Sequence, residues 1–349
     1  MNSGGERKRR AARAGHSAVR IEDVARKAGV SAITVSRTIN QPERVSVPAR
    51  KAVWAAIEET GYIPNQLAGG LASSRTRTIG VIIPTIVNSI FADKVQGMTD
   101  VLHSAGYQLL LANSGYSLDA EAELVAAFLA QRPSGLVLTG VTHSERTRRV
   151  LGNANVPIVE TWAMDEHPLD MLVGFSNYEA SYAMVRHLYA RGYRRIAFVS
   201  APILNNDRAA ERRRGYLEAV RDLGSVTDPA LVREAFFTLE NGAKTFADLL
   251  DVDPRLNAIF FANDVLAAGA LFEARRRGIR VPEDIGIAGF DDVDLAGQAE
   301  PALTTVRIPR YEIGARAAEM LLARIAGEEP EPKIIDLGFE IIERNSTAS

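Results

Sequence analysis

The sequence predicts an all-α helix-turn-helix domain at the N-terminus, followed by an α/β domain of two lobes, each built on a doubly wound parallel sheet. Three observations predict this organisation. The chain has 349 residues, a length typical of two domains or slightly more. Residues 1–75 carry 13 Lys+Arg and 6 Asp+Glu, whereas residues 76–349 carry 28 and 37. From Thr78 onward, apolar strands alternate with amphipathic helices.

The composition excludes several classes of protein. A hydrophobic fraction of 46% is enough for a sizeable core and rules out a wholly disordered chain. The absence of cysteine excludes a disulfide framework, a thiolate zinc site and a cysteine nucleophile. With five histidines, we expect no metal centre and no cofactor. No apolar run reaches the length of a membrane helix, and residues 1–18 are polar, so we expect a cytoplasmic protein with no membrane partner.

The charge distribution points to nucleic acid. A net charge of −2 looks unsuited to a nucleic-acid partner, but it divides into +7 on residues 1–75 and −9 on residues 76–349. Such an asymmetry indicates a basic nucleic-acid module joined to an acidic body. Residues 1–18 are predicted to be a disordered, solvated basic tail, which could add sequence-independent attraction to phosphates.

Residues 19–64 are predicted to form the helix-turn-helix domain. Gly29 can end a first helix in the left-handed conformation, and Ser31 can cap a second. A third helix starts with Ser46 as its cap and ends at Gly61. An ordinary three-helix bundle without a ligand is the alternative. The apolar residues at helical spacing are Ile21, Val24, Ala25 and Ala28 in the first helix and Val35 and Ile39 in the second.

The second helix would lie in the major groove with its N-terminal residues at the base edges. On this interpretation Ala32, Ile33 and Arg37 face the bases. The two apolar side chains can contact thymine methyl groups, and Arg37 can form a bidentate contact with guanine. Three hydroxyl side chains suit phosphate or groove contacts: Ser31, Thr34 and Ser36.

Residues 65–75 are predicted to be a hinge helix that forms only on a partner. Asn65 can cap a short helix, but Gly69 and Gly70 each cost about 1 kcal/mol relative to alanine. A helix of this length is unstable alone in water. Leu71 is suited to wedging between base steps in a minor groove. A plain flexible linker is the alternative.

Residues 76–344 are predicted to bind a small ligand between two lobes. Lobe 1 would comprise about residues 76–176 and 308–335, and lobe 2 about residues 177–307 and 336–344. Helices are expected near 212–222 and 241–250, among others. No G-x-G-x-x-G or Walker loop follows the first strand. In such folds ligands bind beyond the carboxyl ends of the strands.

The candidate ligand contacts follow from these strand ends, and their chemistry suits a polyhydroxy ligand with an acidic group. Arg310 could hold a carboxylate bidentately. Each residue has a local alternative: Asp264 as a helix cap, Asp292 as a turn residue, Glu160 as a partnered buried acid, and the two phenylalanines as core. No catalytic arrangement is found, so we expect no enzyme. The strand-end candidates are Asn88, Phe91, Glu160, Phe175, Asn263, Asp291 and Arg310.

Several stretches resemble lactose-repressor-type (LacI family) transcription factors: IEDVARKAGVSAITVSRTIN, YIPNQLAGGL, IGVIIP, ANDVLAAGAL, VPEDIGIAGFDD and PALTTVRIP. Within that family, PERVSV, LVGFSNYEA and PRYEIGARAAEMLLARIAG are similar to the gluconate repressor branch. The resemblance implies a periplasmic-binding-protein-like ligand domain and a dimer on a palindromic operator. It also implies that Arg212 lies in the cleft, with Arg208 as its competitor, and that Phe175, Asn263 and Asp291 contact the effector.

The sequence and the resemblance together predict a repressor of sugar-acid catabolic genes that an effector releases from its operator. Gluconate is the first choice of effector, followed by a ketogluconate or 6-phosphogluconate. The alternatives are another sugar, or a phosphorylated or protein co-repressor. The chain ends in ERNSTAS without a leucine heptad, so a homodimer is expected rather than a tetramer.

Overall fold

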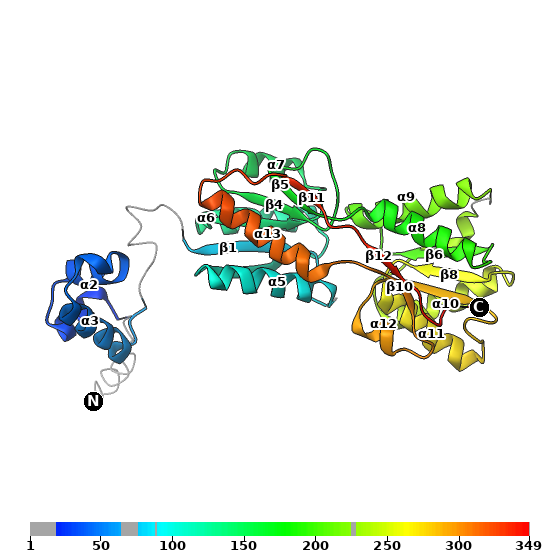
Figure 1. Cartoon of the computed structure of the whole chain (residues 1–349), viewed down its shortest axis with the longest axis horizontal. Helices are drawn as coiled ribbons and strands as arrows, with labels where there is room; N and C mark the ends of the chain where they lie inside the picture. The colour runs from blue at the N-terminus through cyan, green and yellow to red at the C-terminus, as the bar shows by residue number, and fades with distance from the viewer. Residues whose placement is uncertain (1–18, 64–75, 88, 225–227, 349) are drawn as a thin grey trace, which may run out of the picture. The chain divides into compact units, whose positions relative to one another are not determined.

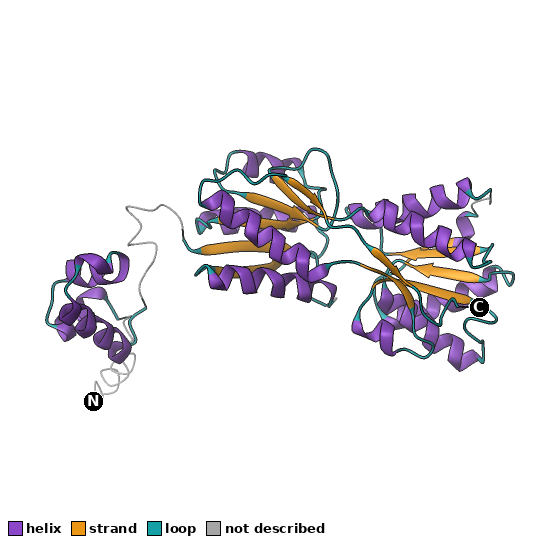
Figure 2. Cartoon of the chain, viewed as in Figure 1, coloured by secondary structure: helices purple, strands orange, loops and turns teal. Residues whose placement is uncertain are grey.

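The computed structural model describes residues 19–63, 76–87, 89–224 and 228–348. The chain divides into two compact units, one up to Thr76 and one from Arg77 onward (Figures 1 and 2). Several predictions lie outside the described residues: the basic tail, the hinge at 65–75 with Asn65 and Leu71, and the ligand contact of Asn88.

The N-terminal unit is a three-helix domain whose helix ends follow the sequence signals. Gly29 has φ 68° and Gly61 has φ 66°, which confirms both as left-handed helix ends. Ser31 Oγ accepts the backbone N–H of Thr34 at 3.1 Å, which confirms the predicted cap. Ser46 occupies the cap position of the third helix but makes no capping hydrogen bond with its side chain. The elements are α1 (Ile21–Ala28), α2 (Ala32–Asn40), η1 (Pro42–Arg44) and α3 (Val47–Thr60).

The core of this unit is small and consists of short side chains from all three helices. Val24, Val35 and Val53 are fully buried, and Ala25 and Ala56 nearly so. Burying a valine side chain stabilises a fold by about 1.5–3 kcal/mol, so these three residues supply much of the drive to fold.

Lobe 1 is a six-stranded parallel sheet in the order β11-β5-β4-β3-β1-β2. Helices α5 and α13 pack together against one face, and α6 and α7 cover the other (Figure 1). The strands are β1 (Thr78–Ile83), β2 (Gln108–Asn113), β3 (Gly135–Thr139), β4 (Ile158–Thr161), β5 (Met171–Gly174) and β11 (Ile334–Asp336). The helices are α5 (Ile90–Ser104), α6 (Leu118–Ala130), α7 (Glu145–Gly152) and α13 (Arg310–Ile325).

Lobe 2 repeats this arrangement in the order β12-β10-β9-β8-β6-β7. Its edge strand β12 pairs antiparallel with β10, whereas the other strand pairs of this sheet are parallel. The strands are β6 (Ile196–Ser200), β7 (Val232–Glu234), β8 (Ala258–Phe261), β9 (Gly286–Asp291), β10 (Thr304–Arg307) and β12 (Glu340–Ile342). The helices are α8 (Asn177–Ala190), α9 (Asp207–Asp222), η2 (Pro229–Leu231), α10 (Leu239–Val252), α11 (Asp264–Arg277) and α12 (Asp294–Gln298).

Two helices of lobe 2 begin earlier than the sequence predicts. Helix α9 begins at Asp207 rather than near 212, because Asn206 Oδ1 accepts the backbone N–H of Ala209 at 3.3 Å and so caps the helix earlier. Helix α10 begins at Leu239 rather than 241, behind the Thr238 cap. The extra turn of α9 matters because this helix faces the space between the lobes.

The chain passes between the lobes three times: from β5 to α8, from β10 to α13, and from β11 to β12 (Figure 1). Each lobe is therefore built from segments that are distant in sequence. None of the helices within the described ranges has the length and hydropathy needed to span a bilayer.

Candidate functional site

The second helix of the N-terminal unit, α2, has one buried face and one solvent-exposed face. Val35 and Thr38 are buried, and the Thr38 hydroxyl donates to the carbonyl of Thr34 at 2.8 Å. On the other side, Ile33 is 64% exposed and Arg37 is exposed one helical turn further along. These two predicted base-reading side chains therefore share a solvent-facing surface.

The other residues predicted to contact DNA make packing or hydrogen-bond contacts within the N-terminal unit. Ala32 is half-buried and packs against the core. The Ser31 and Thr34 hydroxyls lie 2.9 Å apart, which couples both to the helix cap. The Asn40 amide donates to the Ser36 hydroxyl at 3.5 Å. Ile33 and Arg37 are thus the side chains of this set that extend furthest from the fold.

In the larger unit, a cavity lies between the lobes where their central strands end. Phe91 lies on α5 after β1 in lobe 1. In lobe 2, Ser200 is the last residue of β6 and Ala262 follows β8, so the cavity occupies the switch points of both doubly wound sheets. This cavity has a volume of about 20 Å³, and a wider opening of about 390 Å³ adjoins it. The cavity wall consists of Ile90, Phe91, Tyr116, Trp162, Ser200, Ala201, Asn206, Arg208, Ala209, Arg212, Phe237 and Ala262.

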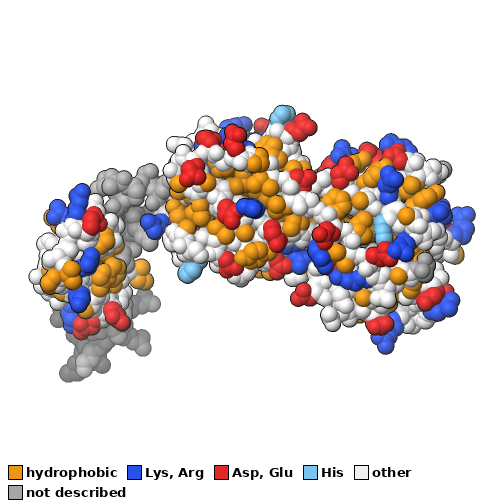
Figure 3. Space-filling view, in the orientation of Figure 1, with side chains coloured by type: hydrophobic (Ala, Val, Ile, Leu, Met, Phe, Trp, Pro, Cys, Tyr) orange, Lys and Arg blue, Asp and Glu red, His pale blue; other side chains and the backbone are white. Residues whose placement is uncertain are grey.

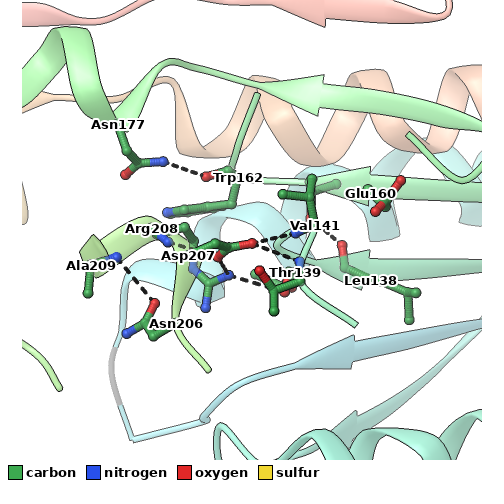
Figure 4. Close-up of polar contacts among 12 residues, drawn as sticks. Leu138, Thr139, Val141, Glu160, Trp162, Asn177, Asn206, Asp207, Arg208 and Ala209 are labelled. Atoms are coloured by element: carbon green, nitrogen blue, oxygen red, sulfur yellow. Dashed lines mark hydrogen bonds and ion pairs between the residues drawn. The ribbon is translucent and has the colours of Figure 1, made fainter. Parts of the chain in front are cut away.

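Asp207 and Arg208, at the start of α9, connect lobe 2 to lobe 1 (Figure 4). Asp207 Oδ2 accepts the backbone N–H groups of Val141 at 2.5 Å and Thr142 at 3.0 Å. Arg208 Nη1 is paired with Asp207 Oδ1 at 2.5 Å and donates to the Thr139 carbonyl at 3.3 Å. Burial alone would raise the pKa of Asp207, but Arg208 and these backbone donors hold it below its ordinary value.

This connection requires a glycine at position 140. Gly140 has φ 93°, and a Cβ atom there would lie 2.1 Å from Arg208 Nη1 and about 3 Å from both Asp207 carboxylate oxygens. A side chain at this φ would be strained, and its Cβ would have to displace the Arg208 and Asp207 side chains from their present positions.

Arg212 lies one turn further along α9, and two of its guanidinium nitrogens donate hydrogen bonds to the protein. Its Nε donates to Asn177 Oδ1 at 2.8 Å, and its Nη1 donates to the Ala262 carbonyl at 2.7 Å. The guanidinium carbon lies 3.6 Å from the centroid of the Phe290 ring. Burial lowers the pKa of Arg212 to about 10, even though Asp291 favours the charged form. The family resemblance left Arg212 and Arg208 as alternative candidates for the cleft arginine, and both line the cavity.

Phe175, Asn263 and Asp291 lie behind the cavity wall as a buried layer. Asn263 Nδ2 donates to Asp291 Oδ2 at 2.7 Å, and Asp291 Oδ1 is 3.8 Å from Arg212 Nη2. Within the described residues, that Oδ1 atom has no hydrogen-bond partner. Burial raises the pKa of Asp291 to about 6. The Phe175 ring is fully buried and packs against Trp162, so these residues support the wall rather than form it.

The interpretation of Asp264 as a helix cap is wrong. The cap of α11 is Asn263, whose Oδ1 accepts the backbone N–H of Val265 at 2.9 Å. Asp264 is buried and accepts from the Thr305 hydroxyl at 2.6 Å and from the backbone N–H of Val293 at 2.9 Å. Burial, with the neighbouring Asp291, raises its pKa well above the ordinary value.

Glu160 points away from the cavity, which corrects its expected role as an effector contact. Strand β4 alternates, so Thr161 faces α5 whereas Glu160 faces α6 and α7. Glu160 Oε1 lies 3.1 Å from His143 Nε2, and its Oε2 accepts the backbone N–H of Leu169 at 2.5 Å. The alternative interpretation, a partnered buried acid, describes this residue.

Arg310 also lies outside the cavity wall, and its expected contact with a ligand carboxylate is likewise corrected. Its Nε donates to Asp93 Oδ2 at 2.8 Å, and its Nη1 donates to the carbonyls of Asp291 and Asp292. Arg310 therefore joins the start of α5 and α13 in lobe 1 to the end of β9 in lobe 2. Asp292, predicted as a turn residue, has φ 50° and is paired with Arg307 and Arg344.

Sequence reasoning missed several residues at the cavity. Tyr116, Trp162 and Asn206 line it, and Lys94 lies directly behind Phe91 and Trp162. A signal for Lys94 was available: it follows Ile90 and Phe91 by four and three residues, so it shares the buried face of their helix. No comparable local signal exists for Trp162.

Comparisons with known proteins agree with both units. Residues 20–65 match the family described as bacterial regulatory proteins, lacI family, and residues 185–347 match a periplasmic binding protein-like domain. The HTH-type transcriptional regulator GntR of Escherichia coli K12 is 39% identical over 321 residues, which cover 92% of this chain and 96% of the relative. The chain belongs to the LacI family. This LacI-family chain is therefore a DNA-binding transcriptional regulator, and the predicted family and two-part fold are confirmed.

Other similar proteins support the same assignment of this LacI-family regulator. GntR of Pseudomonas aeruginosa is 37% identical, with 94% of this chain and 95% of the relative covered. A LacI-family regulator from Silicibacter pomeroyi has a TM-score of 0.89 at 33% identity, with 95% and 100% coverage. The lac repressor dimer bound to operator and an anti-inducer has a TM-score of 0.82 at 28% identity, with the same coverage.

Proposed function

We propose that this LacI-family regulator represses sugar-acid catabolic genes and is released from a palindromic operator by a small effector bound between its lobes. The proposed effector belongs to the gluconate, ketogluconate or 6-phosphogluconate class. Relatives named GntR at 37% and 39% identity support this choice, as does a GntR structure from Chromobacterium violaceum at 38% identity and TM-score 0.75. Since its partner is DNA, we expect it to act in the cytoplasm.

One observation carries the choice of an acidic effector: two guanidinium groups, those of Arg208 and Arg212, line the same cavity. Guanidinium groups bind carboxylates and phosphates through charge-assisted hydrogen bonds. Asn206 and Ser200 add amide and hydroxyl groups that can bind the hydroxyls of a polyol chain. The cavity therefore has groups that can bind the acidic group of a sugar acid and groups that can bind its hydroxyls.

On the DNA side, we propose that Ile33 and Arg37 contact base edges while Ser31, Thr34 and Ser36 face the sugar-phosphate backbone. The exposed positions of Ile33 and Arg37 support this division. A single module of this kind reads only a few base pairs, so a palindromic operator would be read by two copies related by a two-fold axis.

A homodimer is also supported by the surface of lobe 1. Figure 3 shows apolar side chains gathered on the face of lobe 1 that carries α5 and α13. Leu111 on the edge strand β2 is 43% exposed and Tyr311 on α13 is 42% exposed. Exposed apolar surface of this kind is typical of a region that another chain covers.

The test is an operator-binding assay with the full chain and a panel of ligands. Gluconate, the ketogluconates and 6-phosphogluconate should weaken operator binding, whereas glucose should not. Arg212→Met should still bind operator but lose this response; Arg221→Met, an exposed position at the end of the same helix, is the matched control. Release by glucose and not by any acid would overturn the proposal. Tighter operator binding on adding an acid would instead indicate a co-repressor.

A further inference from the structure

Lys94 on α5 has a fully buried ammonium group within lobe 1. Its Nζ donates to Thr139 Oγ1 at 2.7 Å and to Thr161 Oγ1 at 3.1 Å, at the ends of β3 and β4. The two threonine hydroxyls donate their own protons to backbone carbonyls, those of Ile82 and Leu138. Their oxygen atoms are therefore acceptors, and an ammonium with three donors retains one more to use.

The ammonium of Lys94 has no carboxylate partner in the described part of the chain. The charged group that acts on it is Arg208, which has the same sign. Burial and then Arg208 lower the pKa of Lys94 to about 7. The rings of Phe91 and Trp162 lie 5.5 and 5.6 Å from Nζ and stabilise a cation only modestly. A buried charge without a counter-ion is costly, so the site lacks one negative charge.

The position of this unpaired charge links it to the cavity. Phe91, Trp162 and Arg208, which surround Lys94, all line the cavity between the lobes. Thr139 connects the two cations directly, because its hydroxyl accepts from Lys94 and its carbonyl accepts from Arg208 (Figure 4 shows Thr139, Trp162 and Arg208). Lys94 thus lies immediately behind the lobe 1 wall, and the arginines approach from lobe 2.

The other charges around the cavity are already paired. Asp207 is bonded to Arg208 and to the backbone N–H groups of Val141 and Thr142. Asp291 lies beside Arg212. These two carboxylates offset two guanidinium groups, and the charge of Lys94 remains.

We propose that Lys94 determines the specificity of the cavity for effectors that carry a carboxylate or a phosphate, by supplying a positive charge that no carboxylate among the described residues neutralises. This inference rests on the proposed function of the cavity as the effector site. The anionic group would enter beside Phe91 and Trp162 and supply the missing counter-charge. In a low-dielectric site, one such charge acts strongly over a few ångströms.

Anion binding should couple to proton uptake. A nearby negative charge raises the pKa of an ammonium, so Lys94 would take up a proton when an acid binds above neutral pH. The groups that face Nζ are Thr139 from β3, Thr161 from β4, the two aromatic rings and Arg208 from α9. Helix α13 meets α5 there through the backbone of Gly314.

The experiment is calorimetric titration of the full chain with gluconate, 6-phosphogluconate and the uncharged isostere gluconamide. Lys94→Met and Lys94→Gln remove the charge, and Lys244→Met, at an exposed position on α10, is the control. We expect both Lys94 variants to bind the acids at least tenfold more weakly and gluconamide within about twofold of the unaltered chain. At pH 8, titrations in two buffers of different ionisation enthalpy should show proton uptake that the Lys94 variants lack. Comparing the two acids distinguishes a carboxylate from a phosphate partner.

Unchanged affinity for both acids in folded Lys94 variants would overturn the inference and leave the proposed function intact. If the unaltered chain binds gluconamide as tightly as the acids, the proposed sugar-acid function itself fails. Thermal melting checks the fold. Should neither variant fold, NMR of 13Cε-labelled lysines in the unaltered chain replaces them. We expect one lysine resonance to titrate near pH 7 and to shift with gluconate but not with gluconamide. The absence of that shift also overturns the inference.

Discussion

His143 is expected to titrate far above the ordinary range of histidine. Its Nδ1 lies 2.7 Å from Glu121 Oε1 on α6, and its Nε2 lies 3.1 Å from Glu160 Oε1 on β4. The imidazole side chain is completely buried. Burial by itself lowers the pKa of His143, but hydrogen bonds to two carboxylates outweigh it and raise the pKa to about 9. Both ring nitrogens then act as donors, so the ring is an imidazolium at neutral pH.

The higher pKa of His143 in the folded protein makes stability depend on pH. An unperturbed histidine has a pKa near 6.5, and each tenfold gain in proton affinity corresponds to about 1.4 kcal/mol. A rise to about 9 therefore contributes about 3 kcal/mol to the free energy of unfolding. Because the folded-state pKa is the higher one, this contribution is fully present below a pH of about 6.5 and is lost as pH rises through about 9.

The assay is NMR titration of 13Cε1-labelled histidines, with urea unfolding at pH 6.5 and 9.5 as the energetic measurement. One resonance should titrate near pH 9, and His143→Asn should remove it. Glu121→Gln should lower that pKa and reduce the loss of stability between the two pH values. His103→Asn, at an exposed position on α5, is the control. If every histidine in the unaltered chain titrates below pH 7.5, the reasoning from buried carboxylate partners is refuted.

Two further substitutions test other parts of the structure. Arg37→Ala should weaken operator binding by about 1–3 kcal/mol and relax the preference at one base position. A gel shift across operator variants measures both effects. An equal loss of affinity for every operator sequence would mean that Arg37 contacts only phosphate. Gly140→Ala should destabilise the larger unit by about 1–3 kcal/mol, because the new Cβ at φ 93° would meet Arg208 Nη1 at 2.1 Å. Urea unfolding measures the loss against Gly152→Ala, whose Cβ would occupy open space, and equal midpoints would contradict the prediction.

Local signals in the sequence predicted several helix ends in the N-terminal unit correctly. Gly29, Ser31 and Gly61 mark helix ends through the conformation or hydrogen bond of a single residue. Helix α11 ends at Arg277, where Gly278 adopts the left-handed conformation. Such signals act within four residues, so a sequence displays them directly.

The site depends on contacts that a sequence does not display. Arg310 is bonded to Asp93, which lies 217 positions earlier, and that contact moves its guanidinium off the cavity wall. Asn263 and Asp264 are adjacent residues of types that cap helices, but Asp264 accepts instead from the Thr305 hydroxyl, 41 positions later, and from the backbone N–H of Val293. The sequence also gives little sign of helix α7. This helix buries only Thr147 and Leu151 of its eight residues, which is too few for a helical repeat of apolar residues.

Because the chain passes between the lobes three times, the two lobes can be completed only late in translation. Lobe 1 receives its last strand from Ile334–Asp336, and lobe 2 receives its own from Glu340–Ile342. Ser346 is fully buried in lobe 2 and donates to the carbonyl of Ile287. Neither lobe can be completed until nearly the whole chain has left the ribosome. At roughly 5–20 residues per second, the three-helix domain ending at residue 63 would precede a finished effector cavity by roughly 15–60 s. Each new molecule would thus possess a folded DNA-reading domain before it could respond to an effector.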